Sequence, residues 1–188
     1  MTNKLLYCIM LYIGLGGEMY SQSCKSILWS ADKKLVWEDF KGNPDYKKTY
    51  TAITQYNIYS DSTEFKNDTL VFAIRNLFNP NESWVKQLSE ELLTHEQLHF
   101  DIAEVYARKL RKLIKTHVFY RNTMNWDFRE FHDKVLAECA MRQKQYDEET
   151  GHSVNSKRQK EWEAQIAKEL EEYRDYNAVK VAALFRWK

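Results

Sequence analysis

The pattern of hydrophobic and polar residues changes near Pro80. Before this proline, residues 51–59 and 69–75 are rich in β-branched and aromatic residues, and turn-forming residues bound both stretches. This pattern is typical of strands. Residues 35–37 are typical of the start of a further strand. The first part of the chain is therefore predicted to form a small antiparallel sheet.

Hydrophobic residues after the proline recur at intervals of mostly three and four, which predicts an amphipathic helix over residues 84–115. Asn81 or Ser83 can cap its start. A second helix is predicted over residues 126–149, and a third begins at residues 156–159, which match the capping-box pattern. The expected fold class is α+β, with the N-terminal sheet packed on the long first helix and the further helices completing a cleft.

The middle of the first predicted helix carries the sequence His-Glu-Gln-Leu-His, from His95 to His99. Each helical residue turns the side chain by about 100°, so residues four apart share a face. His95 and His99 can therefore direct imidazole nitrogens at one ion, while Glu96 can reach a water beside it as general base. This spacing is that of a zinc-dependent peptidase helix of zincin type. The alternative is a solvated helix face on which these residues align by chance.

A catalytic zinc ion normally takes three protein ligands and leaves one position for water. Asp101 and Glu104 project from the same helix about 180° to 200° away from the histidines, so they cannot bind the same ion. The third ligand must therefore come from later in the chain. Two candidates stay open: Glu138 on the second predicted helix, and His152, which follows the glycine that ends that helix.

Three stretches resemble a bacterial family: residues 35–42 (LVWEDFKG), 95–104 (HEQLHFDIAE) and 146–152 (YDEETGH). The chain resembles the domain-of-unknown-function family DUF922, whose members are regarded as secreted zinc-dependent proteases. The resemblance implies that residues 146–152 belong to the site, which favours His152 over Glu138 as third ligand. The chain departs from the family at Ser153, where the family tends to have glycine.

Two residues of the stretch 146–152 have possible roles in the site that the resemblance implies. Asp147 could orient a ligand imidazole, as carboxylates near metal ions commonly do. Tyr146 could donate a hydrogen bond to the oxyanion that forms when water attacks a carbonyl. The alternative for both is a solvent-facing position near the end of the helix.

The first residues of the chain differ in character from the rest. Lys4 precedes the apolar run 5–17, and a small polar stretch follows it, which is the layout of a secretory signal peptide. The run is too short to span a bilayer, which needs about 20 apolar residues. We therefore expect a signal peptide over residues 1–23, a single zincin-like domain over residues 24–188, and a secreted or periplasmic protein. Lipidation of Cys24, as in bacterial lipoproteins, is the alternative.

The charge of the chain limits which partners are expected. With 29% charged residues and a formal net charge of +1, the chain has no strong field that would attract nucleic acid or a membrane surface. The helix motif and the signal peptide together predict a secreted metallopeptidase that uses Zn²⁺ to hydrolyse peptide or protein substrates. The alternatives are a metal-dependent amidase that acts on a non-protein amide, such as a cell-wall peptide, and a non-catalytic exported binding module.

Overall fold

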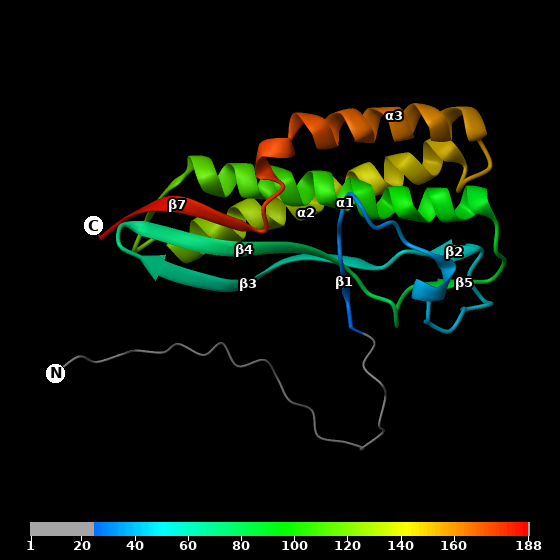
Figure 1. Cartoon of the computed structure of the whole chain (residues 1–188), viewed down its shortest axis with the longest axis horizontal. Helices are drawn as coiled ribbons and strands as arrows, with labels where there is room; N and C mark the ends of the chain where they lie inside the picture. The colour runs from blue at the N-terminus through cyan, green and yellow to red at the C-terminus, as the bar shows by residue number, and fades with distance from the viewer. Residues whose placement is uncertain (1–24, 188) are drawn as a thin grey trace, which may run out of the picture.

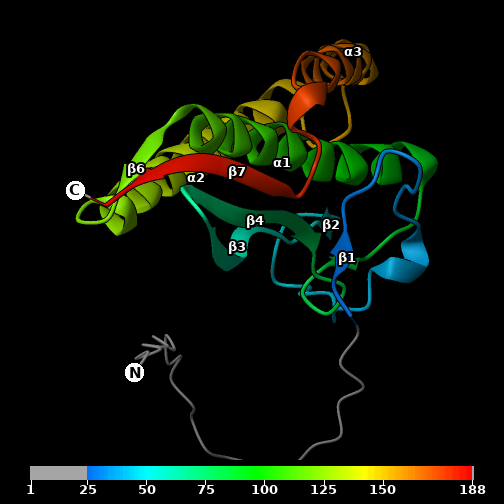
Figure 2. The ribbon, with the colours of Figure 1, turned by 60° about the vertical axis from the view of Figure 1, so that its left-hand side comes forward.

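Three long helices lie on one side of a twisted sheet (Figures 1 and 2). The structure is a computed structural model that describes residues 25–187, with the backbone alone at residues 61–63. The predicted signal peptide at residues 1–23 and the alternative lipidation site at Cys24 lie outside the described residues. The predicted α+β class is confirmed.

Strand β4 (Thr69–Phe78) is the central strand of a five-stranded sheet. β3 (Tyr56–Lys66) pairs antiparallel along one edge of β4, and β7 (Lys180–Arg186) and β1 (Ile27–Leu28) pair antiparallel along the other. β6 (Val118–Tyr120) pairs parallel with β7. The sheet is therefore larger than the predicted N-terminal antiparallel one, because two later segments of the chain return to join it.

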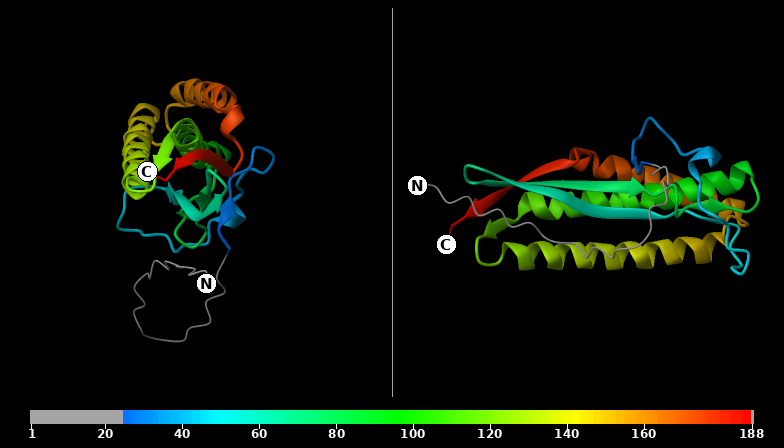
Figure 3. Two further views of the ribbon diagram at one scale, coloured as in Figure 1. Left: turned by 90° about the vertical axis from the view of Figure 1, so that its left-hand side faces the viewer. Right: turned by 90° about the horizontal axis from the view of Figure 1, so that it is seen from below.

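The three helices are α1 (Glu90–Thr116), α2 (Met124–Thr150) and α3 (Ser156–Glu172). The sheet lies along one side of α1, and α2 and α3 lie along its other sides (Figure 3). Residues 100–108 of α1 are consequently all buried. Within residues 25–187, none of the helices has the length and apolar character that crossing a bilayer requires.

A two-stranded sheet lies beside the first half of α1. β2 (Ala52–Ile53) pairs antiparallel with β5 (Trp84–Val85). The predicted start of the first helix is therefore too early, since α1 begins only at Glu90. Its cap is Ser89, whose hydroxyl accepts a hydrogen bond from the Leu92 N–H at 3.1 Å.

Two further expectations about this region are wrong. Ser83, predicted as a possible cap, is buried, and its hydroxyl donates to the Asn79 carbonyl at 2.8 Å. The strand expected near Leu35 does not form, because the Leu35 N–H donates to the side chain of Gln97 at 2.8 Å. A 3-10 helix, η1 (Trp37–Asp39), follows directly. At Leu35 a side-chain partner outweighs local strand propensity, and at Ser83 the hydroxyl is engaged by a backbone carbonyl instead of capping a helix.

A buried ion cluster ties α1 to the sheet and to the end of α3. The Glu104 carboxylate accepts from Arg108 Nε at 3.1 Å and from Arg111 Nη1 at 2.8 Å. Arg108 also donates to the Leu170 carbonyl in α3 at 2.6 Å, and Arg111 donates to the Ile74 carbonyl in β4 at 2.9 Å. These charged hydrogen bonds hold α3 in a defined position on α1.

Candidate metal centre

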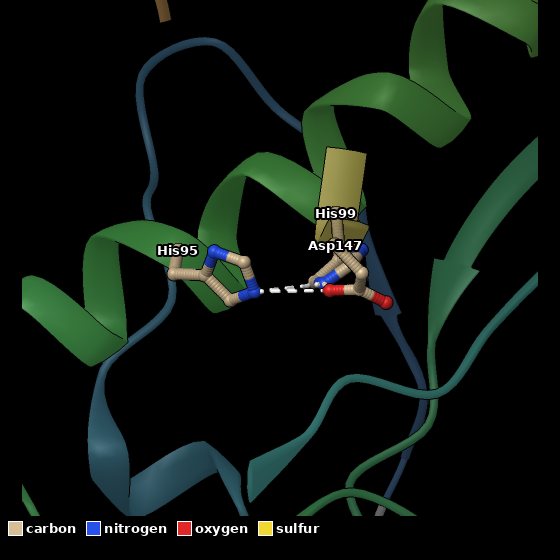
Figure 4. A group of neighbouring side chains, drawn as sticks. All are labelled: His95, His99 and Asp147. Carbon is tan, nitrogen blue, oxygen red and sulfur yellow. Dashed lines mark hydrogen bonds and ion pairs between the residues drawn. The ribbon is translucent and has the colours of Figure 1, made fainter. Parts of the chain in front are cut away.

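His95 and His99 project from the same face of α1, as their spacing predicts (Figure 4). Their Nε2 atoms lie 3.2 Å apart, and their rings are nearly perpendicular at 89°. His95 is 2% exposed. The two imidazoles are therefore held together inside the protein rather than on a solvated helix face.

Asp147 of α2 completes a group of three possible ligands. Its Oδ1 atom lies 3.2 Å from Nε2 of His95 and 3.1 Å from Nε2 of His99 (Figure 4). The three ligand atoms all lie within 4.8 Å of one another. Two imidazole nitrogens and one carboxylate oxygen at such separations could hold a metal ion.

The two residues expected to supply the third ligand lie outside this group. Nδ1 of His152 is 3.4 Å from Oδ1 of Asp147, but the side chain of His152 is 60% exposed, at the rim. Gly151 ends α2 in the left-handed conformation, and His152 continues it at φ 53°, which turns the chain away from the helix axis. Glu138 lies nine residues before Asp147 on α2, about 13 Å along its axis.

Glu96 is buried beside the two histidines. Glu96 is 4% exposed, and its Oε2 atom has no hydrogen-bond partner among the residues that the structure describes. Its backbone carbonyl accepts from the Thr54 hydroxyl at 3.2 Å, which ties this turn of α1 to the segment after β2. A buried carboxylate oxygen without a partner is costly, so this atom is available for a water or a substrate group.

Tyr146 lies behind His95. It is 0% exposed, and its ring stacks on the His95 ring at a centroid distance of 4.6 Å. Its hydroxyl can donate to Gln159 Oε1 at 2.7 Å or to the His95 carbonyl at 3.2 Å. The predicted donation to an oxyanion does not fit this position, because the hydroxyl is enclosed and already has acceptors.

Asp101 and Glu104 face away from the centre, as helical geometry predicts. Asp101 accepts from Trp29 Nε1 at 2.7 Å and from Lys34 Nζ at 3.0 Å. Glu104 belongs to the buried ion cluster with the two arginines of α1. Both carboxylates are thus satisfied by other partners.

Neighbouring groups shift the pKa values of Asp147 and His99. Burial alone would raise the pKa of Asp147, but the hydrogen bonds from His95 and His99 outweigh it and hold this pKa below its usual range. Burial alone would lower the pKa of His99, but the hydrogen bond and charge of Asp147 and the charge of Glu96 raise it. The negative charges of Asp147 and Glu96 therefore favour a bound positive charge at the centre.

A pocket of about 420 Å³ opens onto the centre. The segment 49–54, which includes β2, forms one wall, and α1 and the end of α2 form the others. The walls also include Tyr56, Leu92 and Gln143. Within the described part of the chain, the only titratable side chains lining the pocket, apart from Glu96 and the three ligand groups, are tyrosines and the rim histidine. A substrate would therefore meet a largely uncharged wall next to a charged centre.

One comparison with known proteins gives a match. The family described as "Bacterial protein of unknown function (DUF922)" matches residues 77–153. The match confirms the resemblance to this family over residues 77–153. No curated protein and no solved structure matches the chain. The family's description assigns no activity, so the function has to be argued from the site.

The matched segment contains all the residues that approach the centre from α1 and α2, including Asp147, whose position the sequence did not reveal. Asp147 was expected to orient a ligand, whereas the structure places its carboxylate between the two histidines. Gln143 and Asp147 are four residues apart and share a face of α2, so both reach the histidines once α2 is packed on α1. Gln143 contacts His99 with its side chain, its Oε1 atom lying 2.5 Å from Nδ1.

Proposed function

We propose that this protein is an exported zinc-dependent metallohydrolase that cleaves peptide bonds. One observation carries the proposal: His95, His99 and Asp147 converge at the pocket, with the free carboxylate oxygen of Glu96 beside them. Two imidazoles with one carboxylate form a donor set that suits zinc and leaves a coordination position for water. Export rests on the signal peptide predicted for residues 1–23.

Each residue has a defined task in this proposal. His95 and His99 would hold the ion through Nε2, and Asp147 would hold it through Oδ1 and contribute the negative charge. Zinc, when bound, would polarise the scissile carbonyl and lower the pKa of water to about 7. Glu96 takes the proton of the attacking water on Oε2 and returns it to the leaving amine nitrogen. Tyr146 keeps the His95 ring in place by stacking.

The shape of the pocket favours an extended peptide as substrate. Within the described residues, β2 pairs with β5 on one edge only, and residues of β2 line the pocket. An extended chain could hydrogen-bond to the free edge of β2, as peptides do when they add a strand to a sheet. The uncharged wall favours uncharged side chains next to the cleaved bond. A short cell-wall peptide would use the same residues, and substrate profiling separates the two.

We expect purified protein to cleave a mixture of unstructured peptides, and 1,10-phenanthroline to abolish this cleavage by removing the metal. The reason is that the proposed reaction needs an ion at the three ligands. Peptide products are measured by mass spectrometry, and zinc added after removal of the chelator should restore them. The isomer 1,7-phenanthroline, which does not chelate, is the control. Cleavage that continues unchanged in the chelator would contradict the proposal, and absence of cleavage with metal bound would favour a binding module.

A further inference from the structure

Each histidine of the centre has a glutamine on its second ring nitrogen. Gln159 Oε1 lies 3.2 Å from Nδ1 of His95, and Gln143 Oε1 lies 2.5 Å from Nδ1 of His99. An amide oxygen only accepts hydrogen bonds, so these contacts require a proton on Nδ1. A neutral imidazole that binds a cation through Nε2 has its proton on Nδ1. The glutamines are therefore placed to accept hydrogen bonds from the Nδ1–H groups of imidazoles that bind a metal ion through Nε2.

Other contacts fix the direction of both amide groups. Gln143 Nε2 donates to the His99 carbonyl at 2.9 Å, and Gln159 Nε2 donates to Glu163 Oε1 at 3.0 Å. Carbonyl and carboxylate oxygens only accept, so the amide nitrogens must face them. Turning the Gln159 amide by 180° would place its oxygen against a carboxylate, and its NH₂ group would lose this acceptor. The oxygen of each glutamine is thus directed at its histidine.

Gln159 belongs to α3, which lies outside the segment that matches DUF922. It is 7% exposed and therefore enclosed between α3 and the site. Contacts near both ends hold α3 in place: Trp162 Nε1 donates to Glu149 in α2 at 2.9 Å, and Arg108 donates to the Leu170 carbonyl at 2.6 Å. The buried side chain of Ile166 packs between these two contacts. α3 is consequently positioned by both other helices.

We propose that α3 is part of the metal centre, because Gln159 accepts the Nδ1–H of His95 and so directs Nε2 of this ligand at Asp147. The inference rests on the proposed metal site. Outer partners of metal-binding histidines typically change metal affinity by about 10- to 100-fold when they are lost. Gln159 is a positioning residue, since it contacts neither the ion nor a substrate directly. Metal binding then depends on a helix outside the matched family segment.

The test compares metal affinity in three variants of the full chain. Gln159→Leu removes the acceptor at similar volume and should weaken Co²⁺ and Zn²⁺ binding by roughly 10- to 100-fold. Gln159→Glu combined with Glu163→Gln retains an acceptor toward His95 and a donor–acceptor pair within α3, so it should restore most of the affinity. Gln165→Leu makes the same change on the exposed face of α3 and should leave affinity unchanged.

Affinity is measured by competition with a chromophoric chelator, and the visible spectrum of bound Co²⁺ reports the ligand set. Gln159→Leu should retain the spectrum of the unchanged protein at saturating Co²⁺ and lose only affinity, while circular dichroism shows an intact fold. If unchanged protein binds Co²⁺ and Gln159→Leu binds it equally tightly, the inference is wrong. If the double variant binds as weakly as Gln159→Leu, the acceptor role is wrong. Failure of the unchanged protein to bind either ion would contradict the proposed function itself.

Discussion

Replacing Glu96 by glutamine should lower kcat/KM for peptide cleavage by at least about 100-fold, the lower end of what general acid–base catalysis contributes. Metal content should stay the same, because Glu96 is not one of the three converging groups. Glutamine has nearly the shape of glutamate but cannot take a proton from water. Since Oε2 of Glu96 has no hydrogen-bond partner among the described residues, the substitution breaks no such bond at this atom.

The measurement is initial cleavage rate at several substrate concentrations, together with metal content of the same sample. Glu91→Gln is the matched control, because it makes the same change in the same helix at an exposed position. It should retain the activity of the unchanged protein. Full activity of Glu96→Gln with zinc bound would rule out Glu96 as the base.

Replacing Asp147 by asparagine should weaken zinc binding by more than about 100-fold, beyond the range typical of residues that only orient a ligand. The carboxylate supplies the only negative charge among the three ligand groups, and Oδ1 lies within 3.2 Å of both Nε2 atoms. His152→Ala should weaken binding by less than about 10-fold, because the exposed His152 lies at the rim. Isothermal titration with zinc measures both changes.

Glu148→Gln serves as the control for the charge change, since Glu148 is the next residue and is exposed. Its zinc affinity should equal that of the unchanged protein. The opposite ranking, in which His152→Ala loses zinc and Asp147→Asn keeps it, would make His152 the third ligand, as the family resemblance implies. The pair of variants therefore decides between a carboxylate and a third imidazole.

The part of the site on α1 could be predicted because it depends on local geometry alone. His95 and His99 are four residues apart, and the periodicity that predicts a helix also places them on one face. The same geometry correctly excluded Asp101 and Glu104. What it could not supply is the rotation of α2 about its own axis. That rotation decides whether Asp147 or Glu138 faces α1, and it depends on packing between the helices.

The family resemblance pointed to residues 146–152, and within this stretch the backbone conformation determines which side chain lies beside the two histidines. His152 follows Gly151, and both have positive φ, so the turn carries the imidazole to the rim. Asp147 lies one turn earlier, on the face that already carries Gln143. The contact between Gln159 and His95 could not be predicted from the sequence either, because Gln159 belongs to α3, whose position depends on long-range contacts.

The fold shows the same division between local and long-range information. The pairing of β3 with β4 joins neighbouring segments. The sequence pattern predicted β4 at residues 69–75, whereas the single strand predicted over residues 51–59 divides into β2 and the start of β3. β7 joins the same sheet from more than 100 residues further along the chain, as residues 180–184 pair with residues 69–73. No local pattern reports such a partner. Likewise, residues 84–85 form a strand because β2 pairs with them, although their spacing continues the hydrophobic period of α1.

Element analysis of the full protein, purified without chelators, tests most directly whether the centre holds zinc. The expected result is about one zinc per chain, since one set of three ligands and a water forms one site. The variant with both His95→Ala and His99→Ala should contain almost none. A protein that is isolated without metal and takes up none when zinc is added would contradict the central claim, as would an unchanged zinc content in the double variant.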